Sequence, residues 1–185
     1  MGFHTFDADR AAVLDDPARF AYCSAEELYA LLAPAPDATV ADIGSGTGLY
    51  TDRVAAFVGR VRAVDVQPEM HDRYRENGVP DNVDLVTAEA ADLPFADGEL
   101  DGVVSTFTFH EFADEGALAE LRRVLAPGAR VAVADWSGAG AGADGPPLGE
   151  RFSAAEAESM LADAGFDVGP TSERRETFTL GARRN

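Results

Sequence analysis

The sequence lacks or is short of several residue types, and each shortage excludes a class of protein. Its 185 residues include no lysine and a single cysteine, Cys23. One cysteine excludes an intrachain disulfide and a cysteine cluster for zinc, so we expect neither a bound metal nor redox chemistry. We interpret Cys23 itself as a small, buried, apolar side chain.

Long apolar runs are also missing. No stretch is long enough to span a bilayer, and the first ten residues, MGFHTFDADR, lack the basic-then-apolar order of a signal peptide. Membrane insertion and secretion therefore have no support, and we expect a cytoplasmic protein. The sequence does not indicate an oligomeric state.

Positive charge is scarce. The 15 arginines are outnumbered by 33 Asp and Glu residues, which gives a net charge of −18. A field of that sign repels nucleic-acid backbones, and the arginine pairs at 122/123, 174/175 and 183/184 are too scattered to form a basic patch. We expect no nucleic-acid partner. The acidic residues are interpreted as a solvated surface that serves solubility, as in halophilic proteins, and they predict a salt-adapted source.

The middle of the chain alternates short apolar runs with helical patterns. Such alternation implies right-handed crossovers and a parallel sheet that is covered on both faces. With 46% hydrophobic residues, the chain suits one domain with a substantial core. The runs predict strands at 39–43, 61–66, 83–87, 102–106 and 130–135, with helices at 50–58, 68–76 and 114–125.

The two ends of the chain have a different character. Helices are expected at 9–14 and 25–32, interrupted by Asp16-Pro17. A capping box from Ser153 to Glu156 opens a later helix. The residues at 166–168 and 176–182 then predict two strands that add an antiparallel pair to the sheet.

These patterns divide one predicted domain into four parts. They are an N-terminal helical cap (1–37), a ligand-binding core (38–135), a flexible loop (136–150), and a C-terminal helix with two strands (151–185). The loop, WSGAGAGADGPPLGE, is either a permissive surface connection or a mobile flap beside the site.

A glycine-rich turn, VADIGSGTGLY, follows the first predicted strand and predicts a nucleotide-like ligand. A phosphate-binding loop needs GxxxxGK[ST], which is absent, and a dinucleotide fingerprint needs glycine where Leu49 stands. The missing glycine weakens the dinucleotide hypothesis without excluding it. A third candidate is a sulfonium nucleoside with a zwitterionic methionine end. Backbone amides suit its carboxylate, and Asp42 is placed to meet its ammonium directly or through water.

The second strand ends in an acidic residue. Asp65 lies 21 positions after Gly44, where a carboxylate can accept from both hydroxyls of a ribose. Dinucleotides and S-adenosylmethionine both carry a ribose, so Asp65 supports a nucleoside without choosing between them.

Four motifs in order resemble the series of class I S-adenosylmethionine-dependent methyltransferases, above all the group that contains the ubiquinone and menaquinone C-methyltransferases. The resemblance runs from about residue 38 to 135. It implies a Rossmann-like α/β fold with a seven-stranded, mostly parallel sheet, an antiparallel C-terminal strand, and helices on both faces. The motifs are DIGSGTG (42–48), Asp65, AEAADLPFADG (88–98) and LDGVVS (100–105).

The resemblance also implies S-adenosylmethionine as cofactor and assigns residues to it. Gly44, Gly46 and Gly48 would line the methionine end. Asp65 would hold the ribose, with Val66 against the adenine. Glu89, where aspartate is more usual, would meet the adenine amine, and the Ala90 amide a ring nitrogen. Ser45 and Thr106 complete the predicted cofactor site.

Methyl transfer from a sulfonium is an in-line displacement that needs a positioned acceptor and exclusion of water. An acceptor that loses a proton also needs a base near the end of the fourth strand. His110, at a position where the family often has histidine, and Glu111 are the candidate catalytic residues, although His110 is equally suited to a structural hydrogen bond.

Other aromatic and histidine side chains are interpreted as structural or as surface. The aromatic side chains of Phe107, Phe109 and Phe112 are interpreted as core rather than as an acceptor pocket. His4 and His71 are expected on helical or terminal surface and are assigned no function.

The sequence thus favours methyl transfer to a small molecule. The fourth strand lacks the Asn/Asp-Pro-Pro-aromatic motif of enzymes that methylate nucleic-acid bases, and one cysteine cannot hold a metalloid. Two alternatives remain: a non-catalytic cofactor-binding or regulatory module, and a nicotinamide oxidoreductase, which the missing third fingerprint glycine disfavours.

Overall fold

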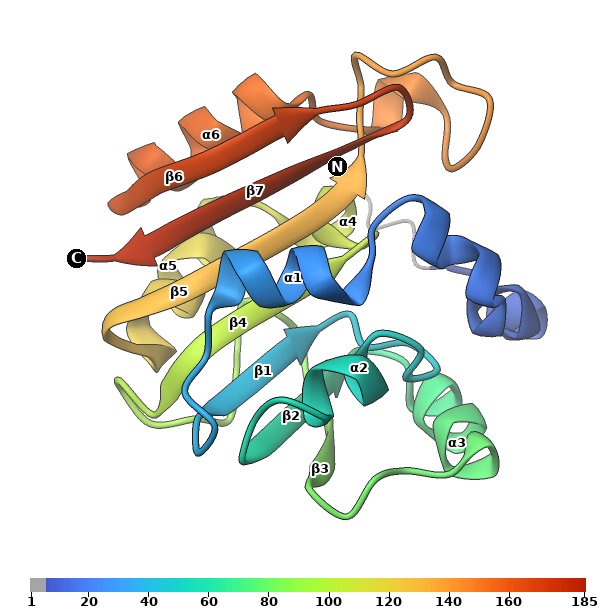
Figure 1. The fold of residues 1–185 in the computed structure, drawn as a ribbon, viewed down its shortest axis with the longest axis vertical. Coiled ribbons are helices and arrows are strands. Elements are labelled where there is room, and N and C mark those ends of the chain that lie inside the picture. The colour runs from blue at the N-terminus through green and yellow to red at the C-terminus, as the bar shows by residue number, and fades with distance from the viewer. Residues whose placement is uncertain (1–5) are drawn as a thin grey trace.

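A single sheet of seven strands organises residues 6–185, the part of the chain that the computed structural model describes (Figure 1). His4 lies outside the described residues. The spatial order is β3-β2-β1-β4-β5-β7-β6. The strands are β1 (Thr39–Ile43), β2 (Arg60–Asp65), β3 (Val83–Thr87), β4 (Leu100–Thr106), β5 (Leu125–Trp136), β6 (Phe166–Glu173) and β7 (Thr177–Arg184).

The pairing confirms the predicted mostly parallel sheet with an antiparallel end. β1 pairs in parallel with both β2 and β4, and the parallel pairing continues to β3 on one side and β5 on the other. β7 is antiparallel to both β5 and β6.

Helices cover both faces of this sheet. The helices are η1 (Ala8–Asp15), η2 (Pro17–Ala21), α1 (Ala25–Leu32), α2 (Thr51–Ala55), α3 (Pro68–Asn77), α4 (Phe109–Phe112), α5 (Glu115–Val124), η3 (Leu148–Glu150) and α6 (Ala154–Asp163). In Figure 1, α1 and α2 lie in front of the sheet, whereas α4, α5 and α6 lie behind it. Within the described residues, none of them combines the length and apolar character that a membrane crossing requires.

The core is built from the alternation of side chains along each strand. Val40, Val104 and Ala132 pack with α1, α2 and α3 on one face. Their neighbours Ala41 and Val103 point to the opposite face, where they join the cluster made with α5 and α6. Because the central strands β1 and β4 are almost entirely buried, they appear as apolar runs in the sequence.

Several details differ from the sequence predictions. The segment before Pro17 forms 3₁₀ turns rather than an α-helix, as the Arg10 N to Asp7 O bond of 2.9 Å shows. β5 extends through Trp136, so the connection to α6 begins later than predicted. The short helices η2, α4 and η3 were not predicted.

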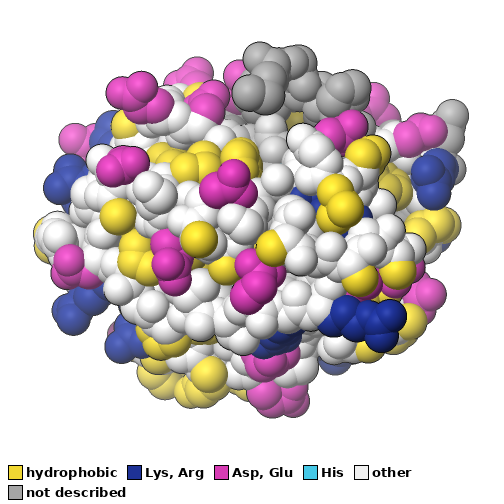
Figure 2. All heavy atoms as spheres, turned by 90° about the horizontal axis from the view of Figure 1, so that it is seen from above, with side chains coloured by type: hydrophobic (Ala, Val, Ile, Leu, Met, Phe, Trp, Pro, Cys, Tyr) yellow, Lys and Arg dark blue, Asp and Glu magenta, His cyan; other side chains and the backbone are white. Residues whose placement is uncertain are grey.

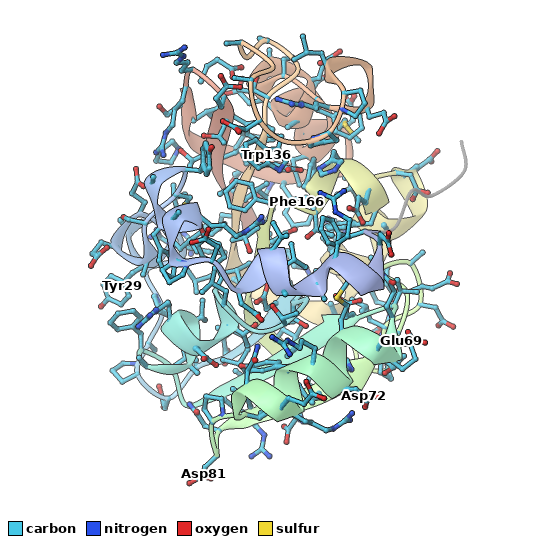
Figure 3. All side chains as sticks on the ribbon, turned by 90° about the vertical axis from the view of Figure 1, so that its right-hand side faces the viewer. Tyr29, Glu69, Asp72, Asp81, Trp136 and Phe166 are labelled. Atoms are coloured by element: carbon cyan, nitrogen blue, oxygen red, sulfur yellow. The ribbon has the colours of Figure 1, made fainter. Side chains whose placement is uncertain are left out.

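His71 was predicted on the surface, and this was wrong. Its side chain is 1% exposed, with Nδ1 3.2 Å from Thr87 Oγ1. The reason is helical periodicity, since Met70, His71 and Tyr74 share the buried face of α3. Glu69 and Asp72 occupy the solvent side of the same helix (Figure 3).

The last glycine of the glycine-rich turn is required by packing. Gly48 has a φ of +93°, and a Cβ there would lie 2.1 Å from Cε2 of the buried Tyr74. The Tyr74 hydroxyl donates to Asp52 Oδ1 at 2.6 Å, which fixes the ring in place. The turn and α3 are therefore locked together.

We expect Gly48→Ala to lower the free energy of unfolding by about 2–4 kcal/mol, because it combines a left-handed backbone with overpacking. Urea denaturation measures the change. Gly149→Ala is the matched control, since a Cβ at Gly149 meets nothing within 4 Å. Equal stability losses in the two variants would contradict this account.

Candidate functional site

A cavity of about 930 Å³ opens at the carboxyl edge of the parallel strands. Strand order reverses between β1 and β4 at this edge, which is where open α/β sheets bind ligands. Figure 3 looks onto the edge, with the N-terminal segment crossing between Trp136 above and α3 below. The volume lies near the upper end of the range for ligand pockets, which leaves room for more than one small molecule.

The cavity brings together all but two of the predicted site residues. Asp42 and Gly48 are not in its lining: Gly48 packs on Tyr74, and Asp42 is fully buried. The predicted residues that do line it are Gly44, Ser45, Gly46, Asp65, Val66, Glu89, Ala90, Thr106, His110 and Glu111.

Asp65 is held rigidly at the end of β2. Its Oδ2 accepts from the Gly46 amide at 2.8 Å, and its Oδ1 accepts from the Gln67 amide at 2.9 Å. Burial raises the pKa of Asp65, although these backbone amides oppose the shift. Each carboxylate oxygen has a second lone pair, so Asp65 can still accept hydrogen bonds from the hydroxyls of a ligand.

Polar atoms around the glycine-rich turn lack partners. Among residues 6–185, Asp42 Oδ1, Ser45 Oγ and Thr47 Oγ1 are buried without a hydrogen bond. Buried polar groups are normally paired, so this cluster fits a polar ligand. Ser45 and Thr47 also line the cavity.

Asp42 is the most deeply buried of these groups. Its Oδ2 accepts from Thr51 Oγ1 at 2.6 Å, and burial raises its pKa to about 7. A nearby cation would favour the ionised form. Asp42 does not reach the cavity surface. Its position therefore fits a contact to an ammonium through water, and not a direct contact.

The N-terminal segment is fastened across the turn. Asp15 accepts from Arg73 Nε at 3.2 Å and from Asn77 Nδ2 at 2.9 Å. The Tyr50 hydroxyl lies 2.9 Å from the carbonyl oxygens of both Arg19 and Cys23. These contacts place η1 and η2 over the cavity, with Leu14 packed beside Gly46.

His110 is bound to a buried aspartate at the end of β5. Its Nδ1 lies 2.9 and 3.0 Å from the two carboxylate oxygens of Asp135, whose Oδ2 also accepts from the His110 amide at 2.7 Å. Burial alone lowers the pKa of His110, but Asp135 outweighs it and raises the pKa above its ordinary value. Because Nδ1 is bound to Asp135, Nε2 is the ring nitrogen that remains for a ligand, and His110 lines the cavity.

Glu111 follows directly and completes a chain of titratable groups. Its Oε1 lies 3.8 Å from His110 Nε2. Burial raises the pKa of Glu111 to about 7, despite the opposing effect of His110. Two groups that can exchange protons near neutral pH thus face the same cavity.

Aromatic rings form the wall beside His110. Phe107 lies 5.0 Å from Trp136 and 6.4 Å from Tyr22 between ring centroids. Phe107 and Phe112 are buried, as predicted, yet both line the cavity. Phe109 is core, packed against Phe112 and Phe152.

Thr47, Asp135 and Arg19 are among the residues of this site that were not singled out from the sequence. Asp135 lies at or near the end of an apolar strand, as Asp42 and Asp65 do, and that position was the available signal. Arg19 and Thr47 carry no comparable signal, because their approach to the cavity depends on how the cap and the turn pack.

The strand order, the glycine-rich turn beside β1 and the carboxylate at the end of β2 together define a class I S-adenosylmethionine-dependent methyltransferase. A family model described as a methyltransferase domain matches residues 41–133, half of the chain. The chain belongs to this methyltransferase domain family.

Curated relatives agree with this assignment. The ubiquinone/menaquinone biosynthesis C-methyltransferase UbiE of Vibrio campbellii is 36% identical over 110 residues, covering 55% of this chain and 42% of that protein. The chain therefore spans less than half the length of the curated relatives it matches.

Solved structures extend the likeness to the whole chain. A SAM-dependent methyltransferase from Aquifex aeolicus is 33% identical with a TM-score of 0.89, covering 98% of this chain and 100% of that one. A Haloferax volcanii methyltransferase, solved in complex with the Trm112 methyltransferase activator, shares the fold at 21% identity and a TM-score of 0.80, covering 96% of each chain. These matches confirm the predicted Rossmann-like methyltransferase fold.

Replacing the partner of His110 tests the geometry of the pair. We expect Asp135→Asn to lower the pKa of His110 by about one unit or more, because an opposite charge in direct contact is lost. NMR titration of the His110 ring measures the shift, and the amide spectrum checks that the variant is folded. Asp163→Asn, an exposed position on α6, should leave the pKa unchanged. A His110 pKa that survives the loss of Asp135 would refute the pairing.

Proposed function

We propose that this protein transfers a methyl group from S-adenosylmethionine to a small-molecule acceptor. The observation that carries the proposal is one cavity in which the glycine-rich turn, Asp65 and the His110–Asp135 pair converge, with room for two ligands. When bound, the cofactor supplies an electrophilic methyl group on its sulfonium.

The residues that would hold the cofactor follow the edge of the sheet. The turn at Gly44–Gly46 and the unpaired polar atoms of Ser45 and Thr47 suit its methionine end. Asp65 suits the ribose, while Val66 and the segment at 88–91 suit the adenine. The adenine contact is the least constrained, because Glu89 is exposed.

His110 would act on the acceptor. Asp135 holds the ring by Nδ1, so the neutral imidazole can accept a proton at Nε2 while Asp135 stabilises the resulting imidazolium. Asp135 is therefore a positioning residue and His110 the candidate base. Glu111, with a pKa of about 7, can accept the same proton or relay it onward.

We propose that the acceptor atom is carbon, because the relatives are named as C-methyltransferases. Carbon becomes nucleophilic enough for methyl transfer when an adjacent acidic proton is lost, as in an enol or phenol. That requirement matches a base on the wall of the cavity.

We further propose that the protein works in the cytoplasm of a salt-adapted cell. The support is its net charge of −18, and Figure 2 shows acidic side chains spread over the face that it displays rather than gathered in one patch. A dispersed acidic surface keeps a protein soluble and repels its own charges when little salt is present.

Cofactor binding is the first test of the proposed activity. We expect the wild-type protein to bind S-adenosylmethionine and its demethylated product in calorimetric titration, and Asp65→Ala to abolish the binding because the ribose loses its acceptor. Asp72→Asn, on the exposed face of α3, is the control and should bind normally. Unchanged affinity in Asp65→Ala would refute the ribose assignment.

The same titrations separate the alternative functions. Binding of NAD alone would indicate an oxidoreductase and contradict the proposal. Tight cofactor binding with no labelled product, after radiolabelled cofactor is supplied with cell extract, would favour a non-catalytic module.

The salt proposal has its own measurement. We expect the melting temperature to rise by about 4 °C or more between low and molar KCl, because salt screens the repulsion between surface carboxylates. Sorbitol at equal osmolality controls for osmotic effects. A melting temperature that is flat or falls with KCl would contradict a salt-adapted surface.

A further inference from the structure

Arg19 is a cation on the cavity wall without an anionic partner. Among residues 6–185, no hydrogen bond or ion pair is formed by its guanidinium, which lines the cavity from η2. Several other half-buried arginines form ion pairs: Arg62 with Asp84, Arg123 with Glu120 and Arg174 with Glu27. In a chain with 33 acidic residues, an unpaired arginine facing a cavity indicates an anionic ligand.

The carboxylates nearest this wall are engaged elsewhere. Asp144 accepts from the Tyr22 hydroxyl at 2.7 Å, and Asp16 accepts from the Ala18 amide at 2.9 Å. Asp135 is bound to His110. Burial lowers the pKa of Arg19, but an arginine remains charged near neutral pH. Its charge is therefore available to a ligand.

The surroundings of Arg19 are aromatic. Its guanidinium carbon lies 4.9 Å from the centroid of Phe107, which orients the planar group against the ring. Phe107 contacts Trp136, and Trp136 contacts Tyr22 at 4.9 Å. This wall suits a planar apolar body, with a cation at one end.

The loop at 144–147 closes the far side of the wall. The buried Arg151 donates to the carbonyl oxygens of Pro146, at 2.7 Å, and of Asp144. Its guanidinium carbon also lies 5.6 Å from the Trp136 ring centroid. Arg151 thus donates its hydrogen bonds to backbone carbonyls, whereas the guanidinium N–H groups of Arg19 have no acceptor in the described part of the chain.

We infer that the methyl acceptor is a planar, largely apolar acid whose carboxylate, or similar small anionic group, pairs with Arg19 while its ring lies against Phe107 and Trp136. This inference rests on the proposed function, because it names the acceptor class of the same cavity. The arrangement directs the body of the acceptor along the aromatic wall toward His110.

A matched pair of probes tests the charge requirement. Calorimetry compares 2-naphthoate with the uncharged 2-naphthamide on the full chain saturated with S-adenosylhomocysteine. We expect the wild-type protein to bind naphthoate about tenfold or more tightly than naphthamide, as a charge-assisted hydrogen bond provides. Arg19→Gln should remove the preference, and Arg19→Lys should retain part of it.

Arg53→Gln is the control variant. Arg53 also lies over an aromatic ring, 5.2 Å from the Phe20 centroid, but it is outside the cavity lining. It should keep the wild-type preference. Circular dichroism confirms that all the variants are folded.

Three results would overturn the inference: no preference for naphthoate in the wild-type protein, equal loss in Arg53→Gln, or a preference that persists in Arg19→Gln. If Arg19→Gln instead loses affinity for S-adenosylhomocysteine and keeps the preference, Arg19 serves the carboxylate of the cofactor. Titrations without S-adenosylhomocysteine keep the two proposals apart. Failure to bind that compound contradicts the proposed function, whereas an Arg19-dependent preference for the acid stands on its own.

Discussion

The site depends on the reversal of strand order between β1 and β4. The chain leaves β1 toward α2 on one face of the sheet and leaves β4 toward α4 on the other, so the two connections diverge and open a crevice. The turn after β1 is fixed to the neighbouring strand, because the amides of Gly44 and Ser45 both donate to Val64 O at 2.9 Å. Because Asp65 follows Val64 directly, this pairing also brings its carboxylate beside the turn.

Three aspartates at or near the ends of strands show how differently a buried carboxylate can be satisfied. Asp135 accepts from the His110 amide, the His110 ring and the Trp136 amide, so its charge is compensated within the protein. Asp65 accepts from two amides at the cavity edge. Asp42 accepts from one hydroxyl and keeps one oxygen unpaired. The internal compensation falls from Asp135 to Asp42, which is the order expected if Asp135 positions a side chain and Asp42 serves a ligand.

Much of the fold could be predicted from the sequence because each parallel strand is a short, mainly apolar run between turn signals, and the central strands are almost entirely buried. The runs at 39–43 and 83–87 coincide with β1 and β3. Local signals also located Asp65, which ends such a run. The pairing of His110 with Asp135 could not be predicted, since the two residues lie 25 positions apart and meet only when β4 and β5 are adjacent.

The cap resisted prediction for a related reason. Arg19 lies in a short 3₁₀ turn whose place depends on contacts to distant elements, among them the Tyr50 hydroxyl bound to its carbonyl oxygen. The burial of His71 likewise depends on which face of α3 meets the sheet. In each case the residue type was visible, but its surroundings were determined by tertiary packing.

The acidic surface repels an acidic acceptor, whereas Arg19 would attract it. The two interactions are compatible because the repulsion acts at long range and the attraction at contact. S-adenosylmethionine carries a net positive charge, so a protein with a charge of −18 attracts it. The same field repels a carboxylate at a distance. At molar salt the screening length falls to about 3 Å, so charges spread over the surface no longer act on an approaching anion. Contact with Arg19 at hydrogen-bond distance is screened far less, because it forms inside a cavity walled by Phe107 and Trp136. Salt therefore weakens the long-range repulsion and preserves the short-range pairing on which recognition of an acidic acceptor depends.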